Sequence, residues 1–319
     1  MNILVRADSS STIGTGHIMR DLVLAEQFDD ANIIFATQEL PGNINHKIEE
    51  KNYTIEILNS NDIKELISII EKHSIEMIII DHYGIDHNYE KALKEITGIT
   101  IFVLDDTYEK HYCDILLNHN VSADESRYSE NVPENCDIRC GIKHTLLRDE
   151  FKNITLNEKN IKDKKTFDIL IAMGGTDPQK YNFKILELMG NDENLHLHFM
   201  TTSSNKNLNI LKKHILHYKN MKLHVDSKNV ALLMNQVDFA IVTPSVVVNE
   251  LLFMQLPFIA IKIIDNQKEI YQFLKKKSFL VLNENEFPIL KEYIYMMCQE
   301  KYYNESKSKI IKLKESKRI

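Results

Sequence analysis

A histidine beside two glycines is the first combination in this sequence that could do chemistry. Gly14, Gly16 and His17 follow the apolar run Ile3–Val5 and a polar loop, and a helical pattern begins with them. Glycines let a ligand approach the backbone, and the free N–H groups of a first helical turn can receive an anion. The helix dipole disfavours a protonated imidazole, so His17 can serve as a general base. A structural histidine remains the alternative, and Met19 breaks the dinucleotide-binding fingerprint.

A second glycine turn lies just past the middle of the chain. Gly174 and Gly175 follow the apolar run Asp168–Met173 and precede Thr176 and Asp177. We expect Asp177 to be the N-cap of the next helix, with the proline after it in the first turn. A capped turn explains the acid and the proline but does not require two glycines. A phosphate lying against the turn would require them, so this segment is a candidate diphosphate site.

A third group of polar residues follows another predicted strand. Thr243 and Ser245 offer hydroxyl groups where a helix is expected to begin. Glu250 lies in the first turns of that helix, where a carboxylate can hold both hydroxyls of a ribose. The alternative is a capping box, but Ser245 and Glu250 do not have its spacing. Asn266, after a later strand, offers an amide to sugar hydroxyl or acetamido groups.

Weaker signals lie elsewhere in the chain. Tyr83 follows a buried strand, where site residues of α/β proteins gather. Asp105 and Asp106 also end a strand; they could bind a metal, but a turn with a cap is the commoner use of such a pair. Cys136 and Cys140 lack the second pair of ligands that a zinc site needs, so we interpret them as reduced thiols. The sequence therefore predicts no metal site and no cofactor.

Strand-like apolar runs alternate with helical patterns through both halves of the chain. This pattern predicts an α/β fold with two Rossmann-like parallel-sheet lobes and a site in the cleft between them. We expect an N-terminal lobe at 1–151, a polar linker at 152–166 and a C-terminal lobe at 167–319, ending in an amphipathic helical tail over 301–319. The expected strands are Ile3–Val5, Ile33–Ala36, Thr54–Leu58, Glu76–Ile80, Thr100–Leu104, Asp114–Leu117, Asp168–Met173, Leu195–Met200, Met221–His224, Phe239–Val242, Phe258–Ile261 and Phe279–Val281, and the expected helices include Met19–Phe28, Asp62–Lys72, Asn229–Asn235 and Val247–Met254.

The composition narrows the functional classes. The 319 residues are 43% hydrophobic and 27% charged, as in ordinary globular proteins, and the net charge of −7 argues against nucleic acid as a partner. No apolar run approaches the roughly 18 residues of a membrane span, and the first residues lack the basic start of a signal peptide. Four cysteines make no disulfide framework. We expect a cytoplasmic monomer that binds neither nucleic acid nor membranes.

Six segments together resemble one family. They are R-A-D-S-S-S-x-I-G-x-G-H-I-x-R-D-L-x-L-A at 6–25, I-D-H-Y-G-I at 80–85, C-D-I-L-L-N at 113–118, M-G-G-T-D at 173–177, V-N-E at 248–250 and D-N-Q at 265–267. The chain is similar in these segments to the UDP-2,4-diacetamido-2,4,6-trideoxy-β-L-altropyranose hydrolases of pseudaminic acid biosynthesis. The first motif is long and specific, whereas M-G-G-T-D and V-N-E are shared with other UDP-sugar enzymes of the GT-B fold.

The resemblance implies a metal-independent reaction that cleaves the anomeric C1–O bond with inversion and releases UDP and the free sugar. His17 matches the family's base, Tyr83 its site tyrosine and Asn266 its substrate-contacting asparagine. The resemblance also implies a GT-B-like fold in which the lobe at 167–319 binds UDP, and the turn that holds UDP matches Thr243, Val248 and Glu250. The full set of expected substrate-binding residues is Gly14, Gly16, Tyr83, Gly174, Gly175, Thr176, Asp177, Thr243, Ser245, Val248, Asn249, Glu250 and Asn266.

Two alternatives to this hydrolase remain open. A GT-B glycosyltransferase would transfer the same type of sugar from UDP to an acceptor other than water. A non-catalytic protein would bind the UDP-sugar without turning it over. The intact His17 and both glycine turns favour an enzyme, and dependence on an added acceptor would distinguish transfer from hydrolysis.

Overall fold

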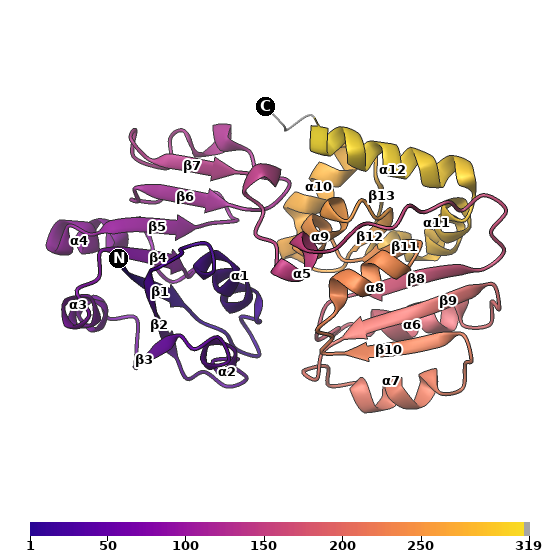
Figure 1. Ribbon diagram of the computed structural model, residues 1–319, viewed down its shortest axis with the longest axis horizontal. Helices are drawn as coiled ribbons and strands as arrows, with labels where there is room; N and C mark the ends of the chain where they lie inside the picture. The colour runs from indigo at the N-terminus through magenta and orange to yellow at the C-terminus, as the bar shows by residue number, and fades with distance from the viewer. Residues whose placement is uncertain (316–319) are drawn as a thin grey trace. The chain divides into compact units, whose positions relative to one another are not determined.

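The chain forms two compact units, Met1–Leu146 and Leu147–Ile319, each built on one parallel β-sheet (Figure 1). The computed structural model describes residues 1–315. The predicted fold class, an α/β protein with two Rossmann-like parallel-sheet lobes, is confirmed. Among the described residues, no helix is both long enough and apolar enough to cross a bilayer.

The first unit alternates strands and helices along its length. Its sheet has seven strands in the order β3-β2-β1-β4-β5-β6-β7, all in parallel pairs. The strands are β1 (Asn2–Ala7), β2 (Asn32–Gln38), β3 (Thr54–Leu58), β4 (Met77–Asp81), β5 (Thr100–Leu104), β6 (Ile115–Asn118) and β7 (Asp137–Cys140). The helices are α1 (Gly16–Ala25), α2 (His46–Glu49), α3 (Ile63–Lys72) and α4 (His87–Thr97), with 3₁₀ turns at Glu125–Tyr128 and Ile142–His144.

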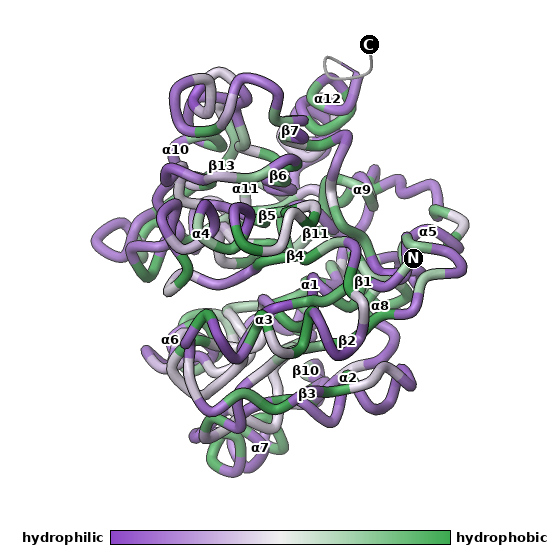
Figure 2. Tube along the Cα trace, turned by 90° about the vertical axis from the view of Figure 1, so that its left-hand side faces the viewer, coloured by the Kyte–Doolittle hydropathy of each residue, from purple (hydrophilic) through white to green (hydrophobic). Residues whose placement is uncertain are grey.

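Two hydrophobic layers cover the faces of this sheet, because successive side chains of each strand point to opposite sides. Ile3 and Val5 of β1 pack with residues of α1 and α2, whereas Leu4 packs with residues of α3 and α4 on the other face. Figure 1 shows these two pairs of helices on either side of the sheet. The central strands β4 and β5 are apolar along almost their whole length (Figure 2), as expected for strands buried on both faces. The layers leave only the ends of the strands for polar chemistry.

The second unit repeats the arrangement with six strands in the order β10-β9-β8-β11-β12-β13, again parallel throughout. The strands are β8 (Phe167–Ala172), β9 (Leu195–Thr201), β10 (Met221–Val225), β11 (Phe239–Val242), β12 (Phe258–Lys262) and β13 (Leu280–Asn283). The helices are α5 (Asp149–Lys152), α6 (Tyr181–Met189), α7 (Leu208–Ile215), α8 (Val230–Gln236), α9 (Val247–Phe253), α10 (Lys268–Lys276), α11 (Leu290–Met297) and α12 (Glu300–Glu315), with 3₁₀ turns at Asp265–Gln267 and Glu284–Ile289.

Each sheet has one topological switch point, where the strand order reverses direction. In the first unit it lies between β1 and β4, whose ends are in register at Ala7 and Asp81. In the second it lies between β8 and β11, where Ala172 pairs with Val242. Ligands of open α/β sheets bind beyond the carboxyl ends of the strands at such points. Candidate site residues are therefore those that follow these four strands.

Several local details differ from the predictions. Strand β7 was not predicted; it alternates charged and apolar residues at the sheet edge, so it lacks the apolar run that reveals a central strand. The predicted start of the helix after Gly175 is wrong, because α6 begins at Tyr181. The backbone is left-handed at Asp177 and Lys180, so the chain makes a further turn before the helix starts.

The polar segment 152–166, expected as a linker, lies in the second unit and packs along it. Ile161 is buried in the hydrophobic core of that unit. The backbone N–H of Asn157 donates to the Asn235 side chain at 2.9 Å, and the Lys159 ammonium donates to the carbonyls of Met234 and Val237. Of the expected helical tail over 301–319, α12 accounts for the part up to Glu315, and 316–319 lie outside the described residues.

Candidate functional site

His17 lies at the start of α1, at the switch point of the first unit. Its side chain is 8% exposed, and its Nδ1 lies 2.6 Å from Oδ1 of Asp81, the last residue of β4. A carboxylate only accepts hydrogen bonds, so this contact assigns the ring proton to Nδ1. The lone pair is then on Nε2. This is the tautomer that a general base needs, with the carboxylate behind the ring orienting it.

Arg20, one turn further along α1, fixes the same carboxylate from the other side. Its Nε donates to Asp81 Oδ2 at 2.6 Å and one terminal nitrogen donates to Oδ1 at 2.5 Å, a bidentate pair. Its other terminal nitrogen donates to Asp106 Oδ2 at 2.9 Å. The Asp81 carboxylate therefore has no freedom to rotate away from His17.

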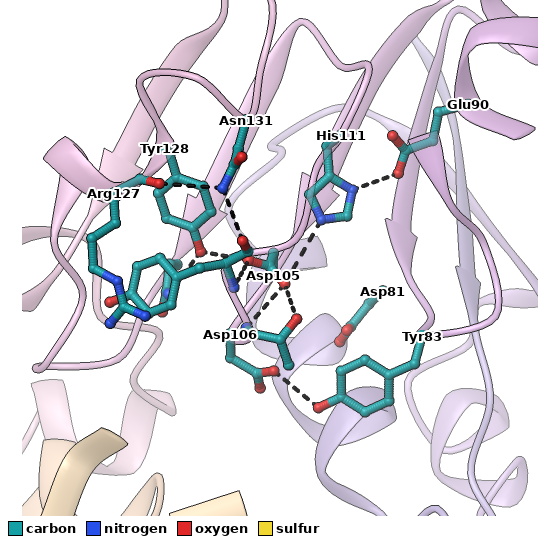
Figure 3. A network of polar contacts seen from close by, with 12 residues as sticks. Asp81, Tyr83, Glu90, Asp105, Asp106, His111, Arg127, Tyr128 and Asn131 are labelled. Atoms are coloured by element: carbon teal, nitrogen blue, oxygen red, sulfur yellow. Dashed lines mark hydrogen bonds and ion pairs between the residues drawn. The ribbon is translucent and has the colours of Figure 1, made fainter. Parts of the chain in front are cut away.

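The same network reaches Tyr83. The Tyr83 hydroxyl donates to Asp106 Oδ1 at 2.9 Å (Figure 3). The Tyr83 ring packs edge-on against His17, with 4.9 Å between ring centroids. Tyr83 is 60% exposed, although its side chain is large and aromatic. The structure thus brings two sequence-predicted residues, His17 and Tyr83, into contact. An exposed tyrosine beside a buried histidine is a suitable contact surface for a ligand.

Electrostatics keeps the carboxylate of this pair charged. Burial opposes ionisation of Asp81, but the Arg20 guanidinium and the hydrogen bond from His17 hold its pKa well below the usual value. For Asp21, one turn after His17, burial and the neighbouring Asp81 charge raise the pKa well above the ordinary value and favour the protonated form. Asp81 therefore carries the negative charge behind the imidazole.

A second carboxylate–histidine pair joins the ends of the same two strands, but here the acid follows β1 and the histidine follows β4. His82 Nδ1 accepts from the backbone N–H of Gly84 at 2.9 Å, so its Nε2 carries the proton and donates to Asp8 Oδ2 at 3.1 Å. Buried Arg6 donates to the same oxygen at 2.7 Å. Asp8 follows β1 and His82 follows β4. The two reciprocal pairs, Asp8 with His82 and Asp81 with His17, tie the ends of these strands together.

A further polar network holds the loop after β5 (Figure 3). Asp105 accepts from the Thr107 hydroxyl and the Tyr128 hydroxyl, each at 2.6 Å. His111 Nδ1 lies 2.7 Å from Glu90, and its Nε2 lies 3.7 Å from Asp105. Burial disfavours the charged form of His111, but these two carboxylates raise its pKa to about 9. Asp105 thus stabilises a turn and Asp106 forms an ion pair, as in the commoner of the two uses considered for this acid pair, rather than a metal site. Within residues 1–315, no group of three or more His, Cys, Asp or Glu side chains is placed to hold a metal ion.

In the first glycine turn, Gly14 is left-handed, with φ of +90°, and its backbone N–H and carbonyl both bond to Ser10. A Cβ built on Gly14 or on Gly16 would meet nothing within 4 Å. The backbone before His17 is therefore open on its outer side, as expected where a ligand approaches. Only Gly14 needs glycine for its conformation.

Glycine is required at the two positions of the second turn for different reasons. Gly174 has φ of +91°, and a Cβ there would meet open space. At Gly175 a Cβ would lie 2.8 Å from the Thr202 side chain, so close packing explains this glycine. The adjacent Thr176 is exposed. Asp177 is buried, and its two oxygens accept from backbone N–H groups at the start of α6, at 2.8 and 2.9 Å.

The turn after β11 lies beside the glycine turn of the second unit. Thr243 N–H donates to the Ala172 carbonyl at the end of β8, and the hydroxyls of Thr243 and Ser245 are 3.3 Å apart. Val248 and Asn249 are buried, and their N–H groups donate to the carbonyls of the third residues before them. These two residues therefore serve the fold of α9 in the structure described.

Glu250 and Asn266 face different surroundings in the second unit. Glu250 is 14% exposed at its side chain, and one of its oxygens accepts from Arg148 at 2.9 Å. Asn266 is exposed in the 3₁₀ turn after β12. Beside this turn lies a cavity of about 410 Å³ at the carboxyl ends of β12 and β13, and its polar lining includes Gln179, Asp265 and Asn283. Amide and carboxylate groups of this kind can bind sugar hydroxyl and acetamido groups.

Sequence reasoning gave no role to three residues of these networks, Asp81, Arg20 and Arg148, and it considered Asp106 only as a metal ligand or a turn residue. Asp81 carried one usable signal, since an acid ends an otherwise apolar strand. Arg20 lies three residues after His17 and so shares its helix face, which is a weaker signal. Nothing local distinguished Arg148 from a solvent-exposed charge.

Known proteins of similar structure define the fold. MurG of Acinetobacter baumannii aligns with a TM-score of 0.61 at 11% identity, covering 97% of this chain and 94% of that one. UGT2 of Phytolacca americana, solved with UDP-2-fluoro-glucose and pterostilbene, aligns with a TM-score of 0.65 at 10% identity, covering 99% and 94%. At such low identity these neighbours show the GT-B fold and nothing finer.

Sequence relatives are more specific, although no protein-family model matches the chain. The spore coat polysaccharide biosynthesis protein SpsG of Bacillus subtilis is 23% identical over 84% of this chain and 79% of its own length. The UDP-2,4-diacetamido-2,4,6-trideoxy-β-L-altropyranose hydrolase of Campylobacter jejuni is 40% identical over 281 residues, which cover 88% of this chain and 98% of that protein. With this identity over nearly the full length of the relative, the chain belongs to the family of the UDP-2,4-diacetamido-2,4,6-trideoxy-β-L-altropyranose hydrolases.

Proposed function

We propose that this protein hydrolyses UDP-2,4-diacetamido-2,4,6-trideoxy-β-L-altrose at the anomeric C1–O bond, with inversion, and releases UDP and the free sugar. The observation that carries the proposal is the His17–Asp81 pair at the switch point of the first unit. The name of the 40% identical relative supplies the substrate and the reaction type. The protein's own residues supply the route.

The chemistry requires one base. His17 Nε2 takes a proton from a water molecule as the water oxygen attacks C1, and the C1–O bond to the diphosphate breaks on the opposite face, which inverts C1. The negative Asp81 holds the Nδ1 proton and stabilises the imidazolium that forms. Such a base contributes about 10²–10⁴-fold to the rate.

No general acid is needed on the leaving group. A glycosidase protonates a sugar alkoxide because it leaves poorly, whereas UDP leaves as a stable anion. We assign the leaving diphosphate to the glycine turn at Gly174, whose open backbone can approach phosphate oxygens. The hydroxyls of Thr243 and Ser245, at the neighbouring strand end, are assigned to the same nucleotide.

The remaining assignments concern orientation. Glu250 is assigned to the ribose hydroxyls, Asn266 to the sugar, and Tyr83 to the sugar beside the base. A metal has no part in this route, and the carboxylates nearest to His17 are held by Arg20 and Tyr83. We therefore expect turnover to survive a chelator. The protein is proposed to act as a monomer in the cytoplasm.

The decisive experiment combines one variant with labelled water. In H₂¹⁸O the label should enter the sugar at C1; label in UDP would mean attack on phosphorus and would refute the proposal. His17→Phe should abolish turnover while UDP binding, measured by calorimetry, stays near the native value. UDP release by this variant at a near-native rate would remove His17 as the base. Product formation only with an added acceptor would indicate a glycosyltransferase.

A further inference from the structure

Arg148 is the charged partner of Glu250 in the second unit. One terminal nitrogen of Arg148 donates to Glu250 Oε1 at 2.9 Å, and the other lies 2.6 Å from Glu150 Oε1. Arg148 directly precedes α5, and Glu250 lies in α9, 102 residues later. No motif in the sequence connected these two residues.

Glu150 anchors the arginine from behind. Its second oxygen, Oε2, accepts from the backbone N–H of Ala231 in the first turn of α8 at 3.0 Å. This hydrogen bond to the backbone fixes the Glu150 side chain, so Glu150 in turn holds Arg148 in place. The Arg148 guanidinium also lies 5.1 Å from the Phe151 ring centroid. Arg148 is 31% exposed, yet three neighbours define its position.

The ion pair matters because Glu250 is poorly solvated. Burial raises the pKa of Glu250, and the nearby Glu150 charge adds to the rise, whereas the charge and hydrogen bond of Arg148 oppose it. These are the charged groups that face Glu250. Without Arg148, the buried carboxyl would retain its proton to a higher pH. A protonated carboxyl loses one of its acceptor oxygens and much of its strength as an acceptor.

We propose that Arg148 is a positioning residue for nucleotide binding: it takes one oxygen of Glu250 and keeps the carboxylate ionised, so that the other oxygen, Oε2, can accept from the ribose hydroxyls of UDP. This inference rests on the proposed function, in which Glu250 binds the ribose. It adds a residue that touches neither sugar nor base. Arg148 acts through Glu250 alone.

The test compares two nucleotides in three proteins. Dissociation constants of UDP and of 2′,3′-dideoxy-UDP are measured by calorimetry for the wild type, Arg148→Gln and Arg148→Lys. The ratio of the two constants isolates the ribose hydroxyls, because both ligands carry the same base and diphosphate. Arg139→Gln is the matched control: Arg139 is also a half-exposed arginine in an ion pair, with Asp137, but it lies in the first unit.

The wild type should prefer UDP by about tenfold to a hundredfold, the range for hydrogen bonds with one charged partner. In Arg148→Gln the preference should be lost at the acidic end of the pH range in which the protein stays folded, while dideoxy-UDP binds as before. It should return as the pH rises, because Glu250 then ionises without help. Arg148→Lys should retain part of the preference, and Arg139→Gln all of it. A general structural defect would not recover with pH.

Three results would contradict the inference in distinguishable ways. An unchanged preference in Arg148→Gln at every pH overturns the role of Arg148 and leaves the proposed function intact. Equal weakening of both nucleotides means that Arg148 contacts the diphosphate itself. A wild type that binds both nucleotides equally overturns the ribose assignment of Glu250, and this inference with it, whereas the His17 experiment is unaffected.

Discussion

Replacing Asp81 by asparagine tests the central pair of the site with the smallest change of shape. Asp81 accepts from His17 Nδ1 at 2.6 Å and from two nitrogens of Arg20 at 2.5 and 2.6 Å. An asparagine keeps one acceptor oxygen, and this oxygen will accept from Arg20, because the guanidinium can only donate hydrogen bonds. The amide NH₂ then faces His17 and donates to Nδ1. The ring proton moves to Nε2, and the lone pair needed for base catalysis is lost.

The size of the effect follows from this change of tautomer. We expect kcat to fall about 10²–10⁴-fold, the whole contribution of a general base. The variant also removes one negative partner from a buried arginine, which costs about 3 kcal/mol of stability, the lower end for breaking a buried pair, since Asp106 still holds Arg20. UDP affinity should stay unchanged, because the residues assigned to UDP lie in the second unit.

The assay measures UDP release under saturating substrate, together with urea unfolding and UDP calorimetry. Asp238→Asn is the matched control, since Asp238 is likewise buried, binds Lys164 at 2.5 and 2.7 Å, and accepts from a backbone N–H. We expect a comparable loss of stability there with native kcat. The double variant of His17→Phe with Asp81→Asn should be no slower than His17→Phe alone, because both changes remove the same base.

A kcat for Asp81→Asn within about threefold of native, in a protein shown to be folded, would refute the reasoning. Such a result would mean that the tautomer of His17 does not depend on Asp81, or that another group takes the proton. A further drop in the double variant would also contradict it, since independent effects multiply.

Two further predictions concern the glycine turn and the buried network around His111. Gly174→Ala should lose about 1 kcal/mol of stability, because φ is +91°, and it should also weaken UDP binding measured by calorimetry. Gly98→Ala is the control: its φ is +69° and the space around it is equally open, so it should lose similar stability but keep native UDP affinity. His111 has its pKa raised from 6.5 to about 9, so its protonation stabilises the fold fully below about pH 6.5, and the contribution, about 3 kcal/mol, is lost as the pH rises through 9. Urea unfolding should show this decline in the wild type, and in His111→Gln it should be absent; equal slopes in both proteins would contradict it.

The α/β fold class could be predicted because the sequence patterns that indicate its strands and helices are local and do not depend on tertiary contacts. Apolar runs of four to six residues between turn signals specify strands wherever both faces will be covered, so the predicted Thr100–Leu104 agrees with β5 to the residue. Edge strand β7 has half-exposed side chains and no such run, so its sequence left it unpredicted. The start of α6 was wrong because two non-glycine residues, Asp177 and Lys180, adopt a left-handed backbone that no propensity favours.

His17 could be selected from sequence because its signal is local: two glycines and a helix start lie within four residues. Its partner could not, since Asp81 is 64 residues away and reaches it only through the pairing of β1 with β4. The same holds for Arg148 and Glu250, 102 residues apart. Charged residues on a helix are usually solvated, so the burial of Arg20 and Asp21 carried no sequence signal.

Residue types and their spacing were thus enough to predict the fold class and to select the two glycine turns and His17 as candidate site residues. Periodicity and backbone freedom depend only on neighbouring residues in the sequence. The protonation states and ion pairs were decided by tertiary structure alone. A charge responds to whatever lies within a few ångströms and to the water that burial removes, and sheet order, rather than position along the chain, sets both.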